Sequence, residues 1–542
     1  MAKFVELMDT TLRDGEQTMG VSFTPAEKLN IAKMLLLEAK LDRIEIGSAL
    51  VSKGEIESVK EVCKWANEAG YLENIEVLGL VDGKRSIDWI RDCGGNAINL
   101  LAKGSLKHLT TQLKKSENQH FLDISKTVEY AKETGMVVNV YLEDWSNGMK
   151  NSQIYVFNLI RHLISLNIDR IMLPDTLGVL TPKEAEGFIS NTMGSFHGVH
   201  FDFHGHNDYG MATANSLAAL HGGARGIHVT VNGLGERAGN ASLEEVVANI
   251  NDHTDWNTKV NEAALSNLSK VVAAFSGKRV SYNKPIIGES VFTQTAGIHA
   301  DGDAKGGLYQ NKLLPERFGR EREYALGKLS GRASLEQNLN ALGIDLSSEQ
   351  EELVLKRIVE LGDRKETLTR EDLPYIIEDV LKRPVEQKIK MLKCSVSSGK
   401  DMAPKASFVL AFDGKEIEEE AEGDGGYDAF MNALSKAANK MKIKLPHLVD
   451  YEVRIPPGGK TDAIVETKIS WELDNKRFTT IGVDSDQIMA AVAATEKMLN
   501  TITRNGVSAK KAKPKSQKKP ATPKEKNKKP AKKVPVKIKK KK

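Results

Sequence analysis

The sequence predicts a (β/α)8 TIM barrel, followed by a helical linker subdomain and an α+β regulatory domain at the C-terminus. Two observations predict the barrel: strand-like and helix-like segments alternate eight times in about the first 250 residues, and reactive polar side chains follow the strand-like segments. A third observation, a duplicated order of strands and helix near the C-terminus, predicts the α+β domain. A chain of 542 residues is also too long for one ordinary core.

The barrel prediction starts from short apolar segments rich in β-branched residues. Eight of them begin at Val5, Arg43, Ile75, Ala97, Val137, Arg170, Val199 and Gly226. Between them lie stretches with apolar residues at i, i+3 and i+4, such as EKLNIAKMLLLEA from Glu27, which are typical of amphipathic helices. This alternation predicts eight parallel strands closed into a barrel over residues 1–279.

The pattern changes after residue 280. Residues 280–388 are predicted to form a linker with a small helical subdomain, which includes SSEQEELVLKRIVELGDR from Ser347. Residues 389–508 consist of two similar halves, in which strands are followed by an amphipathic helix. Because neither half carries an obvious catalytic cluster, we expect regulation or dimerisation from this domain.

Composition indicates a cytoplasmic protein. Hydrophobic residues at 40% and charged residues at 28% are ordinary for a globular chain. No apolar run approaches the roughly 20 residues of a membrane span, and the first residues lack a signal-peptide pattern. The cysteines form no CxxC pair, so we expect free thiols at Cys63, Cys93 and Cys394.

The net charge of +4 averages two different regions. From Lys510 to Lys542 there are 17 lysines and one glutamate, so the rest of the chain is acidic. With almost no apolar residues, residues 509–542 cannot offset their ordering entropy and are predicted to be a disordered lysine-rich tail. Nucleic acid could bind only through this lysine charge, since no aromatic side chain is present for base stacking. The alternative is an appendage that only adds solubility.

The segment HGHND, from His204, carries the strongest signal for a metal site. Residues i and i+2 of a strand point to the same side, so His204 and His206 can reach one ion. Asp14, in LRDGEQTMG, follows the first strand on the same rim. A His-x-His pair alone is more often structural, and its place on a barrel rim is what favours a metal. These ligands suit a divalent ion such as Mn, Mg, Zn or Co.

Three further polar residues are predicted near this rim. Arg13 precedes Asp14 and could stabilise negative charge on a substrate carbonyl oxygen. In NGLGERAGN, from Asn232, the glycine spacing does not fit a dinucleotide-binding loop, and a tight turn that brings Asn240 to the metal is the better interpretation. Glu143 ends the fifth strand on the same rim, where it could be a carboxylate that only pairs with Arg13.

Four motifs, LRDGEQT, HGHND, NGLGERAGN and QTAGIHADG, make the sequence resemble the 2-isopropylmalate, homocitrate and citramalate synthase family from about Phe4 to Leu499. Within the family the likeness is greatest to (R)-citramalate synthases, because YLEDWSNG from Tyr141, EGDGGYDAFMNAL from Glu422 and DYEVRIPPGGKTDA from Asp450 also match. The resemblance implies a metal-dependent acyltransferase that condenses acetyl-CoA with a 2-keto acid in branched-chain amino-acid biosynthesis. It also implies a homodimer.

The resemblance assigns roles to individual residues. Those that match the metal ligands of the family are Asp14, His204, His206 and Asn240. Those that match its catalytic residues are Arg13, Glu143 and His299, and the histidine region comes from the neighbouring subunit of the dimer. Residues that would contact or help to bind the substrate are Thr176, Asp301 and Tyr309.

Pyruvate is the predicted keto acid. Leu78, Leu101 and Tyr141 lie at the ends of the third, fourth and fifth strands and match the apolar substrate pocket of the citramalate enzymes. Two leucines and a tyrosine leave room for a methyl group, whereas an isopropyl group would collide with them. Ordinary barrel packing is the alternative explanation for these three side chains.

The C-terminal domain would, by resemblance, bind isoleucine as a feedback inhibitor. The segment GDGGYDAF offers backbone amides near a helix start, where a carboxylate could bind, and it contains Tyr427 and Asp428. The residues alone indicate only a small anionic ligand.

Two other functions stay open. A 2-isopropylmalate synthase would use 2-ketoisovalerate in leucine biosynthesis. A nucleic-acid-binding protein that has kept a barrel scaffold would account for the basic tail, although every ligand expected of the enzyme is present.

Overall fold

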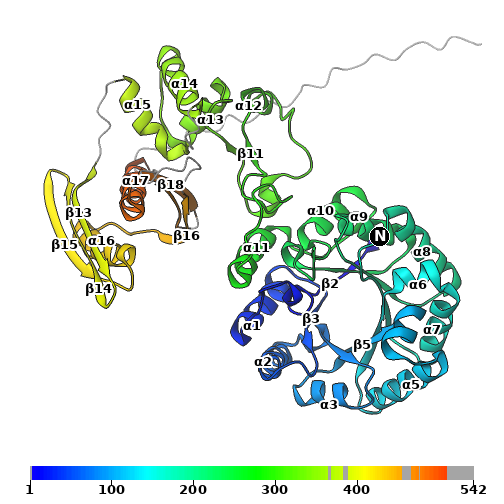
Figure 1. The fold of residues 1–542 in the computed structure, drawn as a ribbon. Helices are drawn as coiled ribbons and strands as arrows, with labels where there is room; N and C mark the ends of the chain where they lie inside the picture. Colours follow the sequence, from blue (N-terminus) through cyan, green and yellow to red (C-terminus); the bar gives the residue numbers. More distant parts are fainter. Residues whose placement is uncertain (1–2, 364–367, 382–387, 455–464, 475, 509–542) are drawn as a thin grey trace, which may run out of the picture. The chain divides into compact units, whose positions relative to one another are not determined.

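The computed structural model describes residues 3–363, 368–381, 388–454, 465–474 and 476–508 (Figure 1). They form two compact units, one up to Ala325 together with Leu329–Leu335, and one of Leu326–Lys328 and the residues from Glu336 on. The predicted lysine-rich tail lies outside the described residues, and so do residues 455–463 of the DYEVRIPPGGKTDA motif. Within the described ranges, no helix is long and apolar enough to span a membrane.

Eight parallel strands of the first unit close into a barrel, which confirms the predicted fold class. In order around the barrel they are β2 (Glu6–Asp9), β3 (Arg43–Ser48), β4 (Ile75–Leu80), β5 (Ala97–Lys103), β6 (Val137–Glu143), β7 (Arg170–Asp175), β8 (Phe201–Gly205) and β9 (Gly226–Val229). Each strand pairs with the next one in the chain, and the pairing of β9 with β2 completes the ring.

Helices surround the barrel, and each follows a strand (Figure 1). They are α1 (Pro25–Lys33), α2 (Lys53–Ala69), α3 (Arg85–Asp92), α5 (Glu117–Glu133), α7 (Gln153–Ser165), α8 (Pro182–Ser195), α9 (Ala212–Gly222) and α10 (Leu243–His253), with the shorter α4 (Leu106–His108) and α6 (Trp145–Asn151) between them. Two helices start at the same local signal: Thr24 and Thr181 each form a capping box with a glutamate three residues later.

Side chains of the strands alternate between the apolar core outside the barrel and the barrel interior, which is part apolar and part polar. On β4, for example, Val77 belongs to the core between strands and helices, whereas Leu78 belongs to a separate cluster with Met8, Tyr141 and Met172. This alternation follows from the period of two in a strand. It leaves a small apolar patch inside the barrel, next to the polar residues described below.

The remaining elements of the first unit follow the barrel or flank it. They are α11 (Glu262–Ser276), α12 (Gly297–Ala304), and two short parallel pairs, β1 (Lys3–Phe4) with β10 (Trp256–Asn257) and β11 (Thr293–Gln294) with β12 (Glu323–Tyr324).

The second unit contains helices and two antiparallel sheets, as the sequence predicts. The helices are α14 (Ser348–Asp363), α15 (Leu373–Leu381) and, from Glu336 on, α13 (Arg332–Leu342). The first sheet and its helix are β13 (Ile389–Gly399), β14 (Met402–Phe412), β15 (Lys415–Glu422) and α16 (Gly426–Met441). The second set repeats this order with β16 (His447–Arg454), β17 (Val465–Leu473), β18 (Lys476–Asp484) and α17 (Gln487–Ser508). Both halves share one apolar core.

Candidate active site

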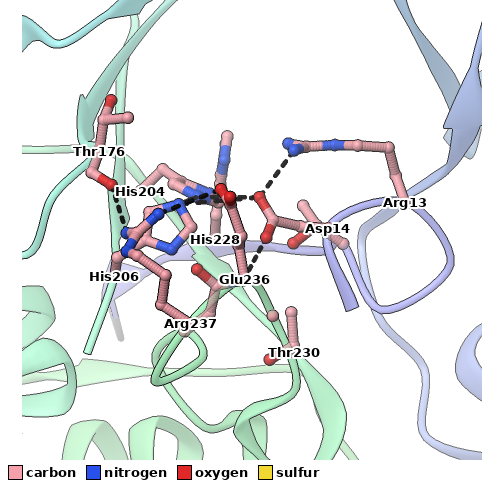
Figure 2. A network of polar contacts seen from close by, with 12 residues as sticks. Arg13, Asp14, Thr176, His204, His206, His228, Thr230, Glu236 and Arg237 are labelled. Atoms are coloured by element: carbon pink, nitrogen blue, oxygen red, sulfur yellow. Dashed lines mark hydrogen bonds and ion pairs between the residues drawn. The ribbon is translucent and has the colours of Figure 1, made fainter. Parts of the chain in front are cut away.

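The carboxyl ends of β2 and β8 bring three potential metal ligands together (Figure 2). His204 lies on β8, His206 follows that strand, and Asp14 lies in the turn after β2. Nε2 of His204 is 3.3 Å from Nε2 of His206 and 3.5 Å from Oδ2 of Asp14, which is 3.8 Å from Nε2 of His206. Because metal–ligand bonds are about 2.0–2.2 Å long, one divalent ion between these atoms can contact all three.

The protonation states of these side chains suit a cation. Burial lowers the pKa of both histidines, to about 4 in His206, so their rings are neutral imidazoles that can donate a lone pair. Burial opposes the charge on Asp14, but Arg13 and the two histidines outweigh it and hold the pKa of this carboxyl well below its usual range.

Asn240 completes this group. Its Nδ2 donates to Oδ1 of Asp14 at 3.0 Å, while its buried Oδ1 has no hydrogen-bond partner among the described residues. An unpaired buried oxygen beside three ligand atoms is an atom that a cation would satisfy. The donor set therefore fits the divalent metal that the sequence motifs imply.

A tight glycine loop places Asn240 there. His206 and Asn240 form an antiparallel bridge at the end of β8. A Cβ on Gly235 would lie 2.4 Å from Nδ2 of Asn240, and a Cβ on Gly239, which has φ of +88°, would lie 2.0 Å from the carbonyl oxygen of Gly233. The glycines of NGLGERAGN thus allow the close backbone approach that a side chain would prevent.

Arg13 is held by three different partners. Its Nε donates to Oε2 of Glu45 at 2.5 Å, its Nη1 to Oδ2 of Asp14 at 2.7 Å, and its Nη2 to the hydroxyl of Tyr141 at 3.2 Å. Burial opposes its charge, but Glu45 and Asp14 outweigh burial and raise its pKa. A guanidinium has five N–H groups, so two stay available for a substrate oxygen.

Glu143 pairs with Lys103. The two residues are register partners at the carboxyl ends of β5 and β6, and Nζ of Lys103 contacts Oε2 of Glu143. The sequence alternative in which Glu143 only pairs with Arg13 is therefore wrong, because Glu45 takes that place. Glu143 keeps 22% of its side chain exposed, so its carboxylate can reach a ligand at the barrel mouth.

Leu78, Leu101 and Tyr141 come together inside the barrel. Leu78 and Tyr141 are 9% and 2% exposed, and the partly buried Leu101 packs against them. The Tyr141 hydroxyl reaches Arg13, so this apolar cluster adjoins the polar group that surrounds Asp14. Burial, assisted by Glu45, raises the pKa of Tyr141 well above its usual value, so the phenol keeps its proton.

Thr176 lies directly after β7, on the same rim as the histidines (Figure 2). Its hydroxyl accepts from the backbone N–H of Asp144 at 2.9 Å, and its carbonyl oxygen accepts from Nη2 of Arg237 at 2.7 Å. Because the hydroxyl accepts in this bond, its own hydrogen can be donated to a substrate oxygen.

Family models match the chain in three successive segments. The HMGL-like family matches residues 4–272, the homocitrate synthase post-HMGL domain-like family residues 286–366, and the LeuA allosteric (dimerisation) domain residues 367–503. Over 501 residues the chain is 38% identical to the (R)-citramalate synthase CimA of Methanocaldococcus jannaschii, with 92% of this chain and 99% of that protein covered. The chain belongs to the 2-isopropylmalate, homocitrate and citramalate synthase family.

Other relatives in this synthase family carry two different names. A putative (R)-citramalate synthase CimA of Archaeoglobus fulgidus is 37% identical over 501 residues, with 92% of this chain and 99% of that protein covered. The 2-isopropylmalate synthase of Methanocaldococcus jannaschii is 35% identical over 506 residues, with 92% and 94% covered. The family predicted from the motifs is thus confirmed, and it favours an enzyme over a nucleic-acid-binding protein.

The synthase motif QTAGIHADG lies outside the barrel. His299 is an exposed residue of α12, and its ring lies 4.2 Å from the ring of Tyr309. Asp301, on the same helix, pairs with Lys305. Within the described ranges, no hydrogen bond or ion pair joins these residues to the metal-ligand group, so the structure does not bring them into the site of their own barrel.

Tyr427 and Asp428 lie in the first turn of α16. The hydroxyl of Tyr427 is 2.7 Å from Oγ1 of Thr495 on α17, which links the helices of the two halves. Oδ2 of Asp428 accepts from the backbone N–H of Asp424 at 3.0 Å. Asp428 thus adds a negative charge at the start of α16. This is the same helix start at which the sequence predicts that an anionic ligand binds.

Three polar residues that sequence reasoning missed stand beside the site: Glu45, Lys103 and His228. Glu45 and His228 interrupt the apolar strand segments RIEIG and GIHVTV, and Lys103 ends the segment AINLLAK. A polar side chain within such a run was the available signal, since a buried charge in a strand requires a partner.

Proposed function

We propose that the chain is an (R)-citramalate synthase that condenses acetyl-CoA with pyruvate and then hydrolyses the thioester, in isoleucine biosynthesis. The observation that carries this proposal is the apolar cluster of Leu78, Leu101 and Tyr141 directly beside the group of Asp14, His204 and His206. The similarity to a curated (R)-citramalate synthase over nearly its whole length supports it.

The metal-ligand residues and Arg13 would bind the keto acid. Asp14, His204 and His206 would hold a divalent ion, with Asn240 beside them; Mn, Mg, Zn and Co all suit this donor set. When bound, such an ion polarises a carbonyl as a Lewis acid. The two remaining N–H groups of Arg13 would stabilise charge that develops on the keto oxygen, which is the work of an oxyanion donor.

Proton transfer would fall to Glu143 and His299. A base removes a methyl proton from acetyl-CoA, the resulting enolate carbon attacks C2 of pyruvate, and the new alkoxide takes up a proton. Water then cleaves the thioester to give citramalate and CoA. Lys103 would fix the carboxylate of Glu143. His299 would act from a neighbouring subunit, because no hydrogen bond or ion pair among the described residues joins it to the metal-ligand group of its own barrel.

Dimerisation and feedback control would involve the second unit. The match to the LeuA allosteric (dimerisation) domain over residues 367–503 supports a homodimer with an amino-acid effector, for which we propose isoleucine. Exposed apolar side chains of α12 and the following loop, Ile298 and Leu308, flank His299 and Tyr309 and would be covered by the second subunit.

The alternative substrate is 2-ketoisovalerate, which would make the chain a 2-isopropylmalate synthase. A probable 2-isopropylmalate synthase and a 2-isopropylmalate synthase are each 35% identical to this chain, so relatives of both kinds are similar to it. The apolar cluster inside the barrel argues against it, because an isopropyl group needs space that Leu78 and Tyr141 occupy.

Product identification tests the proposal. The full-length protein, loaded with each of the four metals in turn, is incubated with acetyl-CoA and pyruvate, and CoA release is followed with a thiol reagent. Chiral chromatography should identify the product as (R)-citramalate, and reactions without keto acid serve as the control. Absence of CoA release with pyruvate and with 2-ketoisovalerate, in every metal, would reject a synthase of either kind.

A further inference from the structure

Asp202 and His228 form a second polar layer inside the barrel. Figure 2 shows His228 next to the candidate site, where its ring lies 5.5 Å from that of His204. Asp202 lies on β8, two residues before His204, and His228 lies on β9. Both are buried, at 0% and 1% exposure, and no role described so far involves them. A buried carboxylate and imidazole are costly unless their hydrogen bonds are satisfied, so their partners indicate what they do.

Four residues form one hydrogen-bonded series from this layer to the site. Oδ2 of Asp202 is 3.2 Å from Nε2 of His228, and Nδ1 of His228 is 3.1 Å from the hydroxyl of Tyr141. The same hydroxyl lies 3.2 Å from Nη2 of Arg13. The series therefore ends on the guanidinium that contacts Asp14.

The direction of each hydrogen bond follows from the groups involved. Asp202 pairs with Arg43 at 2.5 Å, so it is an ionised carboxylate that can only accept. Nε2 of His228 must then carry the hydrogen, and in the neutral ring Nδ1 accepts the hydroxyl hydrogen of Tyr141. Nη2 of Arg13 can only donate, so it donates to the oxygen of Tyr141.

Glu45 is the competing acceptor for this hydroxyl hydrogen. Its Oε2 lies 3.4 Å from the Tyr141 oxygen, which is longer than the 3.1 Å to His228, and it already accepts from Nε of Arg13 at 2.5 Å. The shorter contact to an otherwise unused acceptor favours His228. The His228 imidazole therefore fixes the direction of the Tyr141 O–H bond, and with it the direction in which the lone pairs of that oxygen point.

The ring of Tyr141 is also held from the side. It meets the ring of His228 edge to face at 5.5 Å and that of His204 at 6.0 Å. Because this ring belongs to the apolar cluster with Leu78, a change in its position would alter both the pocket wall and the support of Arg13.

From this geometry we propose that Asp202 and His228 are positioning residues: they orient Tyr141, which in turn holds Arg13 towards the substrate. The inference rests on the proposed function, since it assigns a task within the same reaction. Loss of such an outer contact typically lowers activity by about 10- to 100-fold without removing a group that touches the substrate.

A double-mutant cycle tests this relation. His228→Leu should lower kcat by about 10- to 100-fold, with a smaller change in KM for the keto acid. In a Tyr141→Phe background the same substitution should change kcat by less than about twofold, because no hydroxyl is left to orient. His228→Asn should recover part of the loss, because its amide oxygen can stand where Nδ1 accepts. Equal losses in both backgrounds would show that His228 only supports the fold.

Two additions keep the test decisive. If His228→Leu does not fold, Asp202→Asn takes its place. This variant preserves the shape of the side chain but can reverse the direction of its hydrogen bonds. Its loss of kcat should likewise disappear in the Tyr141→Phe background. The cycle uses whichever 2-keto acid the wild type converts, so a wrong substrate leaves it valid. If no keto acid is converted, the proposed function fails alone, and nitrogen-15 NMR of histidine decides: a hydrogen on Nε2 of His228 supports the proposal, and one on Nδ1 overturns it.

Discussion

Shortening Leu78 to alanine should widen the substrate pocket and reduce the preference for pyruvate. Leu78 projects from β4 into the cluster that contains Tyr141 and Met172, and it is 9% exposed. The isopropyl group of 2-ketoisovalerate has two carbons more than the methyl group of pyruvate. The alanine variant loses three side-chain carbons at this position, which is enough to accommodate both.

The expected size of the effect follows from these carbons. In a roomy pocket, two further buried carbons would contribute about 1.6 kcal/mol at about 0.8 kcal/mol each. In a tight pocket this gain becomes strain of about 1–3 kcal/mol. Because about 1.4 kcal/mol corresponds to a tenfold change in rate ratio, relief of the strain alone should lower the preference for pyruvate by about 5- to 150-fold.

The assay compares kcat/KM for the two keto acids in the wild type, Leu78→Ala and Val77→Ala. Val77 is the matched control, because it neighbours Leu78 on β4 but packs into the core between strands and helices. The ratio of the two specificity constants should fall in Leu78→Ala and stay unchanged in Val77→Ala. An unchanged ratio in Leu78→Ala, or an equal change in both variants, would refute the pocket assignment.

Four other variants test separate parts of the account. Asp14→Asn should raise the metal concentration needed for half-maximal activity, because an anionic ligand is lost; an unchanged metal dependence would remove Asp14 from the ligand set. His120 is a buried residue of α5, and its Nε2 accepts from the backbone N–H of Lys103 at 3.2 Å. Burial lowers the pKa of His120 from 6.5 to about 4, so the unfolded chain binds more protons and the free energy of unfolding falls as the pH drops through 6.5 towards 4. In denaturant unfolding, the wild type should lose about 2 kcal/mol more than His120→Gln between pH 7 and pH 5, whereas equal losses would contradict the neutral buried ring. Tyr427→Phe and Asp428→Asn should weaken isoleucine inhibition, and full inhibition of both would place the effector elsewhere.

The barrel could be predicted because its signals are local. Each strand is an apolar run of a few residues, and each helix shows its own periodicity, so the alternation is visible without knowledge of contacts. The rim residues Asp14, His204 and His206 could be grouped for a similar reason: all carboxyl ends of the strands meet at one face.

The partners inside the barrel could not be predicted, because they depend on register and layer. Arg13 meets Glu45, which is 32 residues away, and Tyr141 meets His228, which is 87 residues away. Glu143 could have met either Arg13 or Lys103, and the choice is made by the pairing of β5 with β6, which aligns Lys103 with Glu143. Composition and spacing do not contain that alignment.

The most direct test of the central claim is a competition between keto acids. The full-length, metal-loaded wild type is given acetyl-CoA with equal concentrations of pyruvate and 2-ketoisovalerate, and the ratio of products gives the ratio of specificity constants. A pocket formed by Leu78, Leu101 and Tyr141 predicts citramalate in about 10- to 200-fold excess. A predominance of 2-isopropylmalate would contradict the assignment and make the chain a 2-isopropylmalate synthase.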